Sequence, residues 1–339
     1  MKKRSRSPAP ADAPPSSHAA PSLLLPSDAF ALIGGQSALR QPLHRSCLLY
    51  EHQRGWRELP PLLPALPRGV FGASAALAGG RLVAVGGCTT PGAVRVAHAA
   101  ALGTGSTAWT PLPDMLQARF GAGTAVCKDL LIVAGGCDGG KPLKTVEALA
   151  LGSSSSAAAA ATWAPLAPMT VARYSFSAAT VGSLMYAVGG SGAGGRALRD
   201  VEALDLESPG IWKTMPPLAT ARRHCSSTAS ADGTVWVAGG CGATRAALSS
   251  VERLRPKGTA WEAAPAMRQA REWPVLLPTE SGGLLAIGGR SGDRFLCDAE
   301  FLPLNGSAWQ PAPEAALPAP RVGAAAIVVG AWAKGWAKN

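Results

Sequence analysis

The chain of 339 residues is poor in charged side chains, because Asp, Glu, Lys and Arg make up only 16% of it, against about a quarter in an average globular protein. It is rich in residues that interrupt helices, with 40 glycines and 29 prolines. This composition argues against a helical bundle and against a doubly wound fold with long helices. The apolar fraction of 47% can build a core, so full disorder is also excluded.

The chain also lacks paired cysteine motifs. Its cysteine count of seven is odd and no two cysteines have CxxC spacing, which argues against a disulfide-stapled secreted scaffold and favours a reducing compartment. The basic N-terminus has no apolar stretch typical of a secretory signal, and no apolar run reaches the length of about 18 residues that suggests a membrane span. We expect a cytoplasmic or nuclear protein without membrane contact. An organelle transit peptide remains open, because the first residues are basic and serine-rich.

Three markers recur along the chain with one period near 50 residues. The first is a Gly-Gly doublet that ends a short apolar run, and its intervals are 52, 49, 54, 50 and 49 residues. The doublets are Gly34-Gly35, Gly86-Gly87, Gly135-Gly136, Gly189-Gly190, Gly239-Gly240 and Gly288-Gly289. The second is a tryptophan: Trp56, Trp109, Trp163, Trp212, Trp261 and Trp309. The third is an arginine: Arg68, Arg119, Arg173, Arg222, Arg271 and Arg321. Shared periods of this length indicate a repeat architecture.

Each repeat fits four β-strands. In the third unit these are residues 119–127, 130–136, 145–151 and 162–168, and no segment of the chain shows a sustained helical period with caps. Several four-stranded sheets in series bury both faces only by stacking on their neighbours around an axis. The fold predicted is therefore all-β, a six-bladed β-propeller.

The two ends of the repeat region complement each other. Residues 29–35 read as a second strand with no first strand before them, whereas the segment from Arg321 reads as a first strand with no second strand after it. We expect the C-terminal strand to join the first blade and close the ring. The predicted organisation is a disordered basic, Pro- and Ser-rich tail at 1–28, the propeller at 29–330 and a short basic tail at 331–339.

The repeat resembles the Kelch repeat. A Gly-Gly doublet, a later Val-Glu pair (Val146-Glu147, Val201-Glu202, Val251-Glu252) and a tryptophan within a period near 50 are typical of that family. The resemblance implies a protein-interaction module. In the wider family such propellers act as substrate adaptors of ubiquitin ligases, and arginines at similar positions hold acidic peptides. No BTB or F-box segment is present in this sequence, so a ligase role would need a separate subunit.

The recurring arginines are the candidate partner-binding residues. Alignment of the first strands by their small residues places Arg119, Arg173, Arg223, Arg271 and Arg321 at one site, with Val70 in the second unit. Such a ring at the mouth of the channel would bind carboxylates. The predicted partner-binding set is Arg119, Arg173, Arg222, Arg223, Arg271 and Arg321. The alternative is that these arginines bond loop carbonyls inside the fold. A net charge of +11 supports an anionic partner only weakly.

The sequence has few residues in arrangements typical of a catalytic site. The five histidines are scattered, without HxH or HExxH motifs, so we predict no catalytic residue, no metal and no cofactor. Cys88, Cys137 and Cys241 each follow a doublet, which reads as inheritance by duplication in preference to a redox or metal site. No nucleic-acid-binding motif appears. The alternative function is a mutarotase or isomerase of an anionic sugar, because enzymes of that kind use a similar Kelch ring with arginine and glutamate.

Overall fold

The computed structural model describes residues 28–37, 43–52, 54–61, 70–90, 94–95, 99–103, 106, 108–151 and 162–330. Apart from Asp28, the two tails predicted at 1–28 and 331–339 lie outside the described residues, and so does Arg68. Within the described residues no helix is long and apolar enough to cross a membrane.

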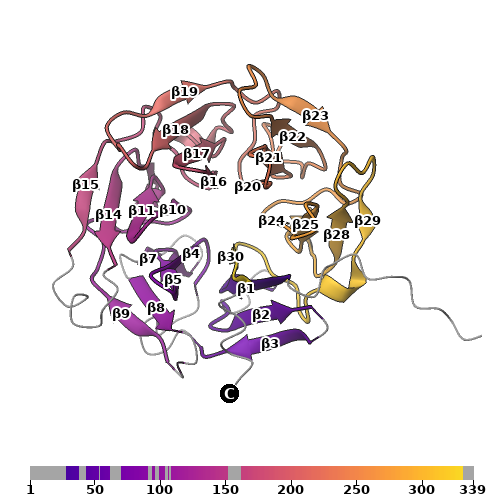
Figure 1. Ribbon diagram of the computed structural model, residues 1–339, viewed down its shortest axis with the longest axis horizontal. Coiled ribbons are helices and arrows are strands. Elements are labelled where there is room, and N and C mark those ends of the chain that lie inside the picture. The colour runs from indigo at the N-terminus through magenta and orange to yellow at the C-terminus, as the bar shows by residue number, and fades with distance from the viewer. Residues whose placement is uncertain are drawn as a thin grey trace, which may run out of the picture.

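The described strands form six four-stranded antiparallel sheets around a central axis (Figure 1), and the predicted all-β propeller is confirmed. The sheets, each given from inner to outer strand, are β30 (Ala325–Val328), β1 (Ala29–Ile33), β2 (Cys47–Glu51) and β3 (Gly55–Leu59); β4 (Ser74–Ala78), β5 (Arg81–Val85), β8 (Ala99–Gly103) and β9 (Thr110–Leu112); β10 (Gly123–Cys127), β11 (Leu130–Ala134), β14 (Val146–Ala150) and β15 (Ala164–Leu166); β16 (Ser177–Val181), β17 (Leu184–Val188), β18 (Val201–Asp205) and β19 (Lys213–Met215); β20 (Ser226–Ala229), β21 (Val235–Ala238), β22 (Val251–Leu254) and β23 (Glu262–Ala264); and β24 (Val275–Pro278), β25 (Leu284–Ile287), β28 (Ala299–Leu302) and β29 (Gln310–Pro311).

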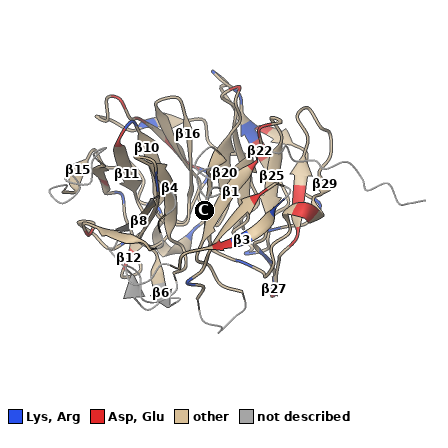
Figure 2. Ribbon diagram, turned by 60° about the horizontal axis from the view of Figure 1, so that its bottom comes forward, with Lys and Arg blue, Asp and Glu red and all other residues tan. Residues whose placement is uncertain are grey.

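Short hairpins extend some of the loops between the second and third strands of a sheet. They consist of β6 (Cys88–Thr90) with β7 (Val94–Arg95), β12 (Cys137–Asp138) with β13 (Lys141–Pro142), and β26 (Arg290–Ser291) with β27 (Arg294–Phe295). Two 3-10 turns, η2 (Ala193–Gly195) and η3 (Pro313–Ala315), complete the described elements. Figure 2 shows β6, β12 and β27 along the same edge of the ring.

The second strand of each sheet is apolar on both sides because it is packed between two neighbouring sheets. In β11, Leu131 and Val133 pack with Val83 of the preceding sheet, whereas Ile132 packs with Met185 of the following one. Alternate side chains of a strand point to opposite faces, so a strand between two sheets reads as a continuous apolar run. The runs that end in Gly-Gly follow directly from this packing.

The Gly-Gly doublets allow the next blade to approach closely. The Gly87 N–H donates to the Arg119 carbonyl at 2.7 Å. A Cβ on Gly86 would lie only 2.6 Å from that same carbonyl oxygen, and Gly86 and Gly87 have φ values of +62° and +95°. Only glycine combines this space requirement with this backbone conformation.

The periodic tryptophans bind neighbouring blades together. Each indole N–H donates, over 2.7 to 3.0 Å, to a backbone carbonyl of the preceding blade or the link that leaves it. The donor and acceptor pairs are Trp56 with Ala316, Trp109 with Pro60, Trp163 with Pro113, Trp212 with Ala167, Trp261 with Pro216, and Trp309 with Pro265. The contact from Trp56 to Ala316 spans 260 residues of sequence, so the first and last sheets meet through the contact used elsewhere.

The innermost strand of the first sheet comes from the C-terminal part of the chain. β30 pairs antiparallel with β1, with Phe30 opposite Val328 and Ile33 opposite Ala325. The first sheet therefore holds strands from both ends of the described chain, and β1 has a paired strand on each side.

Removal of β30 should expose the edge of β1 and cause aggregation. A truncation that deletes residues 320–339 leaves the apolar backbone edge at Phe30–Ile33 without its partner, and an unpaired edge of this kind invites intermolecular pairing. Size-exclusion chromatography with light scattering should show aggregates. The matched control deletes only residues 331–339 and keeps every described strand. A monomeric longer truncation that melts cooperatively would contradict the expectation.

Candidate functional site

The recurring arginines lie inside the blades. Arg173 has no exposed surface, and its Nη2 contacts Glu202 Oε1 at 2.7 Å. Its Nη1 donates to the Gly189 carbonyl at 2.8 Å and to the Asp200 carbonyl at 2.7 Å. Glu202 in turn accepts backbone N–H groups from Thr170 and Val171. One guanidinium therefore joins the first strand, the doublet and the third strand of its blade.

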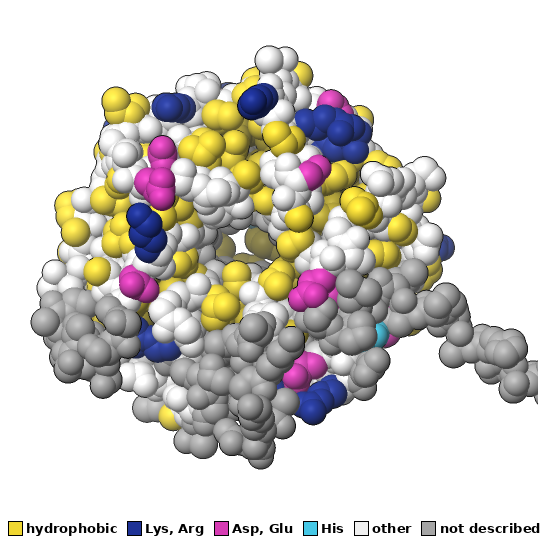
Figure 3. Space-filling model, viewed as in Figure 1, with side chains coloured by type: hydrophobic (Ala, Val, Ile, Leu, Met, Phe, Trp, Pro, Cys, Tyr) yellow, Lys and Arg dark blue, Asp and Glu magenta, His cyan; other side chains and the backbone are white. Residues whose placement is uncertain are grey.

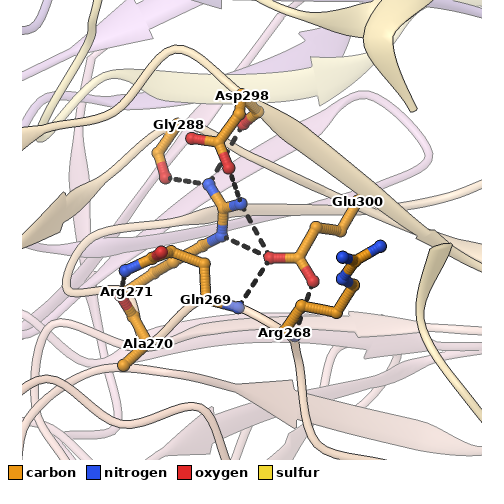
Figure 4. A network of polar contacts seen from close by, with 7 residues as sticks. All are labelled: Arg268, Gln269, Ala270, Arg271, Gly288, Asp298 and Glu300. Carbon is orange, nitrogen blue, oxygen red and sulfur yellow. Dashed lines mark hydrogen bonds and ion pairs between the residues drawn. The ribbon is translucent and has the colours of Figure 1, made fainter. Parts of the chain in front are cut away.

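The same arrangement recurs in three other blades. The ion pairs have nitrogen–oxygen distances of 2.6 to 2.8 Å and join Arg119 to Glu147, Arg222 to Glu252, and Arg271 to Glu300. Figure 4 shows the last of these, in which Glu300 also accepts the backbone N–H groups of Arg268 and Gln269. Burial lowers the pKa of Arg119 and Arg173, whereas the neighbouring Glu147 and Glu202 raise it.

The prediction that these arginines line the mouth of the channel is therefore wrong. Arg119, Arg173, Arg222, Arg271 and Arg321 are all at most 5% exposed, and a partner cannot reach their guanidinium groups. The alternative given in the sequence analysis, that these arginines bond loop carbonyls inside the fold, describes their contacts. The recurring Val-Glu pair was the available signal, because an arginine and a glutamate that recur together indicate an internal ion pair.

The alignment of Arg223 with the other arginines is also wrong. Arg222 is the buried member of the set, and Arg223 lies one residue later, with its Nε donating to Cys241 Sγ at 3.4 Å. A slip of one residue in extended chain moves a side chain to the opposite face. Arg223 is thus the one predicted partner-binding arginine whose side chain is only partly covered.

Two blades lack the ion pair. In the first blade Arg321 is buried, but the strand position that holds glutamate elsewhere is occupied by Leu48. The Arg321 guanidinium contacts the Gly34 carbonyl and Ser46 Oγ, each at 2.7 Å, and its Nε has no hydrogen-bond partner. In the second blade the equivalent residues are Val70 and, by strand register, Ala100. The arginine and glutamate are thus lost together in one blade, and the glutamate alone in the other.

The unpaired charge of Arg321 affects His44. Burial, with the nearby Arg321 charge as a second cause, lowers the pKa of His44 from 6.5 to about 4. Its Nε2 is buried without a hydrogen-bond partner. Protonation of His44 in the folded protein is therefore opposed by both its surroundings and its neighbour.

The central channel has a volume of about 500 Å³, and most of the described residues that line it have small side chains. Six residues with positive φ surround it near one mouth: Gly72, Gly121, Ser175, His224, Trp273 and Gly323. Successive members are joined by backbone hydrogen bonds, for example from the His224 N–H to the Ser175 carbonyl at 2.9 Å. Among the described lining residues there is no Lys, Arg, Asp or Glu. Figure 3 shows the opening seen from the other face, with apolar side chains around it.

Exposed cations lie on the loops between second and third strands. Lys141, Arg196, Arg245 and Arg294 occupy these loops in four consecutive blades, and each is exposed. We call this surface the loop face and define it by residues 137–145, 191–200, 241–250 and 290–298. These segments hold seven Lys and Arg residues against four Asp residues. The sequence analysis missed the loop face, although each of these four cations lies five or six residues after the second glycine of its doublet.

Replacement of one buried arginine should strongly destabilise the protein. Arg173→Met leaves the Glu202 carboxylate buried without its counter-charge, and loss of one partner of a buried ion pair costs about 3–5 kcal/mol. Urea unfolding followed by circular dichroism should show that loss. The exposed Arg196→Met serves as the matched control and should change stability by less than about 0.5 kcal/mol. Equal effects of the two substitutions would show that the pair contributes little.

The stability of the protein should fall as the pH drops from about 6.5 to 4, partly through His44. The pKa of His44 is about 4 in the folded protein and 6.5 without its surroundings, so the unfolded chain takes up the proton first. The stabilising contribution is complete above pH 6.5 and is lost as the pH falls to about 4. Urea unfolding at several pH values should show a flatter curve for His44→Gln than for the original chain. Parallel curves would contradict this assignment.

The comparisons with known proteins agree with this geometry. The family model of the Kelch motif matches residues 118–170, 172–219 and 222–268. The chain is similar to a solved structure titled "Structure of YjhT", at 14% identity and a TM-score of 0.66, over 86% of this chain and 99% of that one. At this identity the likeness concerns the fold alone. No curated protein matches the sequence. Three consecutive Kelch motifs, matched on sheets that share one plan, support the resemblance of the chain to the Kelch repeat family.

Proposed function

We propose that the protein is an interaction module that docks an acidic segment of a protein partner on the loop face. The observation that carries the proposal is the set of exposed cations on four consecutive blades, Lys141, Arg196, Arg245 and Arg294. Equivalent loops of a propeller lie at equal intervals around its axis, so these charges form an arc along one mouth of the channel. The loop face carries a net positive charge, with seven Lys and Arg residues against four Asp residues, and such a surface attracts an acidic partner over a distance. This set replaces the buried arginines as the candidate binding residues.

The chemistry of the loop face suits carboxylates. Arginine binds a carboxylate through two parallel hydrogen bonds, and three of the four tip cations are arginines. Arg223 adds a fifth, partly covered cation beside the 191–200 loop, where it contacts the Gly195 carbonyl. Asp138 and Asp293 lie in the same loops and select against partners whose acidic residues would face them.

The role as a substrate-recognition subunit of a ubiquitin ligase, through a separate ligase subunit, follows from the family resemblance and is part of the same proposal. A cytoplasmic or nuclear location accords with this role. The alternative function, isomerisation of an anionic sugar, needs arginine and a carboxylate facing one cavity. The described lining of the channel brings no such pair together, so the interaction module is the better supported function.

Charge reversal on the loop face should abolish binding of acidic peptides without loss of stability. The variant combines Lys141→Glu, Arg196→Glu, Arg245→Glu and Arg294→Glu. Exposed charge contacts contribute about 0.5 kcal/mol each, so loss of four weakens binding by at least about thirtyfold. Fluorescence anisotropy with a labelled Glu-rich peptide, at low and at physiological ionic strength, measures the effect. The melting temperature should change little.

The control for this experiment carries the same change of net charge on other exposed surface. It combines Lys128→Glu, Lys213→Glu, Arg255→Glu and Lys257→Glu, which lie outside the loop face and are exposed. The control should bind the peptide nearly as well as the original chain. Equal weakening in both variants would show that only the total charge matters, and the proposed docking surface would then be wrong.

A further inference from the structure

Three side chains that can ligate a metal converge beside the mouth of the channel. His224 Nδ1 lies 3.3 Å from Glu272 Oε2 and 3.6 Å from Cys241 Sγ, and the three ligand atoms all lie within 4.8 Å of one another. Cys241 is 1% and Glu272 4% exposed. Both neighbours therefore approach the same ring nitrogen of His224.

This convergence is unlike a nucleophile relay. In a relay the base contacts the nucleophile through one nitrogen and the acid through the other, whereas here sulfur and carboxylate share Nδ1. A single proton on Nδ1 cannot be shared well between two acceptors. Convergence of nitrogen, sulfur and oxygen on one point is the arrangement that a metal ion requires.

Two of the three separations between the ligand atoms match those of a tetrahedral zinc site, and the third is within 4.8 Å. Zinc binds cysteine sulfur at about 2.3 Å, and histidine nitrogen or carboxylate oxygen at about 2.0–2.1 Å. Tetrahedral angles then place sulfur about 3.5–3.6 Å from nitrogen, and nitrogen about 3.3–3.4 Å from oxygen. The observed sulfur–nitrogen distance of 3.6 Å and nitrogen–oxygen distance of 3.3 Å agree with these two values. The mixed nitrogen, sulfur and oxygen set also suits zinc better than the hard ions Mg²⁺ or Ca²⁺.

The cluster is not part of the structural machinery of the repeat. The residue after the doublet is also cysteine in two other blades, and there it forms a backbone bridge with a phenylalanine: Cys88 with Phe71, and Cys137 with Phe120. Glycine follows each of those phenylalanines at the position of His224. The blades fold on the same plan without the cluster. The fold therefore does not require a histidine and a glutamate beside this cysteine.

The backbone holds the three ligands in place. Arg223 and Cys241 exchange two backbone hydrogen bonds, at 2.8 and 3.0 Å, and Glu272 exchanges two with Arg290. The indole of Trp273 stacks on the His224 imidazole with centroids 3.6 Å apart. Ligands on rigid, mutually bonded backbone lose little entropy when they bind an ion.

Two positively charged arginines lie beside the three ligands, so the site can accept Zn²⁺ only if the added charge stays small. Arg223 Nε donates to Cys241 Sγ, and Arg290 Nη2 contacts Glu272 Oε2 at 3.1 Å. When Zn²⁺ displaces the proton of the Cys241 thiol, the proton leaves to solvent and a Zn–S bond forms. The net charge of the site then rises by only one, because two positive charges arrive and one proton departs. The Arg223 N–H remains a donor to the thiolate, as outer groups commonly do around metal ligands.

We propose that His224, Cys241 and Glu272 form a zinc-binding site beside the channel. Three protein ligands leave one tetrahedral position for water or a ligand group, as in zinc sites that bind exchangeable ligands. His224 and Trp273 line the channel, so that position is reached from the mouth of the propeller. Cys241 and Arg290 belong to segments of the loop face, but zinc binding does not depend on the acidic docking proposed there.

Metal titration of the reduced full-length protein tests the site. Zinc, competed against a chromogenic chelator, should bind with one high-affinity equivalent per chain and should bind more tightly as the pH rises. Cobalt(II) should give the charge-transfer absorption of a thiolate ligand. Cys241→Ser should abolish that band and weaken zinc binding by about a hundredfold or more, since even outer-shell changes cost about 10–100-fold.

Two further variants keep the result decisive. Cys137→Ser, at the equivalent position of another blade, should keep both the cobalt band and the zinc affinity. Glu272→Gln should keep the band but weaken zinc binding, and it decides the question should Cys241→Ser fail to fold. The proposal is overturned by the absence of a stoichiometric zinc equivalent, by a cobalt complex without the thiolate band, or by equal effects of the two serine variants.

Discussion

The buried guanidinium–carboxylate pair organises four of the blades, and the positions of the outer loops depend on it. In the blade of Arg271, one side chain contacts Gly288, Asp298 and Glu300, while Glu300 holds the backbone of the incoming link. Taking both charges out of water is costly, and the cost is offset only because almost every donor and acceptor finds a partner. The pair therefore acts as a specific lock on geometry more than as a source of net stability.

Because the ion pair fixes the backbone, the blades can place different side chains at the mouth of the channel. The arginine backbone carbonyl accepts the doublet N–H of the neighbouring blade, as Arg271 does from Gly240 at 2.8 Å. The next residues continue into the ring around the axis, where the Trp273 N–H donates to the His224 carbonyl at 2.7 Å. Because the backbone is held this way, its side chains vary without disturbing the sheets. Glycine serves in some blades, and histidine or tryptophan in others.

The period of the sequence predicted the strands and their assembly into a propeller, because these are properties shared by all repeats. It did not predict the direction in which the arginines point. Equivalence shows that Arg119 and Arg173 have similar surroundings, but it does not show whether those surroundings are solvent or core. The pairing of Arg173 with Glu202 spans 29 residues, and only the joint recurrence of the two types pointed to it. The choice between Arg222 and Arg223 depended on a register of one residue, which small side chains alone do not set.

The departures from the repeat carry the information about function. Where Leu48 replaces the glutamate, Arg321 keeps a charge that its blade does not neutralise, and His44 responds to it. In two blades His224 replaces a glycine and Glu272 replaces a phenylalanine of other blades, and their donor atoms converge with that of Cys241 although no fold requirement brings them together. Both this cluster and the exposed cations of the loop face lie on the side where second strands end. A fold that builds its sheets on one repeated plan leaves that one side free to vary between blades, and binding chemistry gathers there because substitutions on it do not cost the fold its packing.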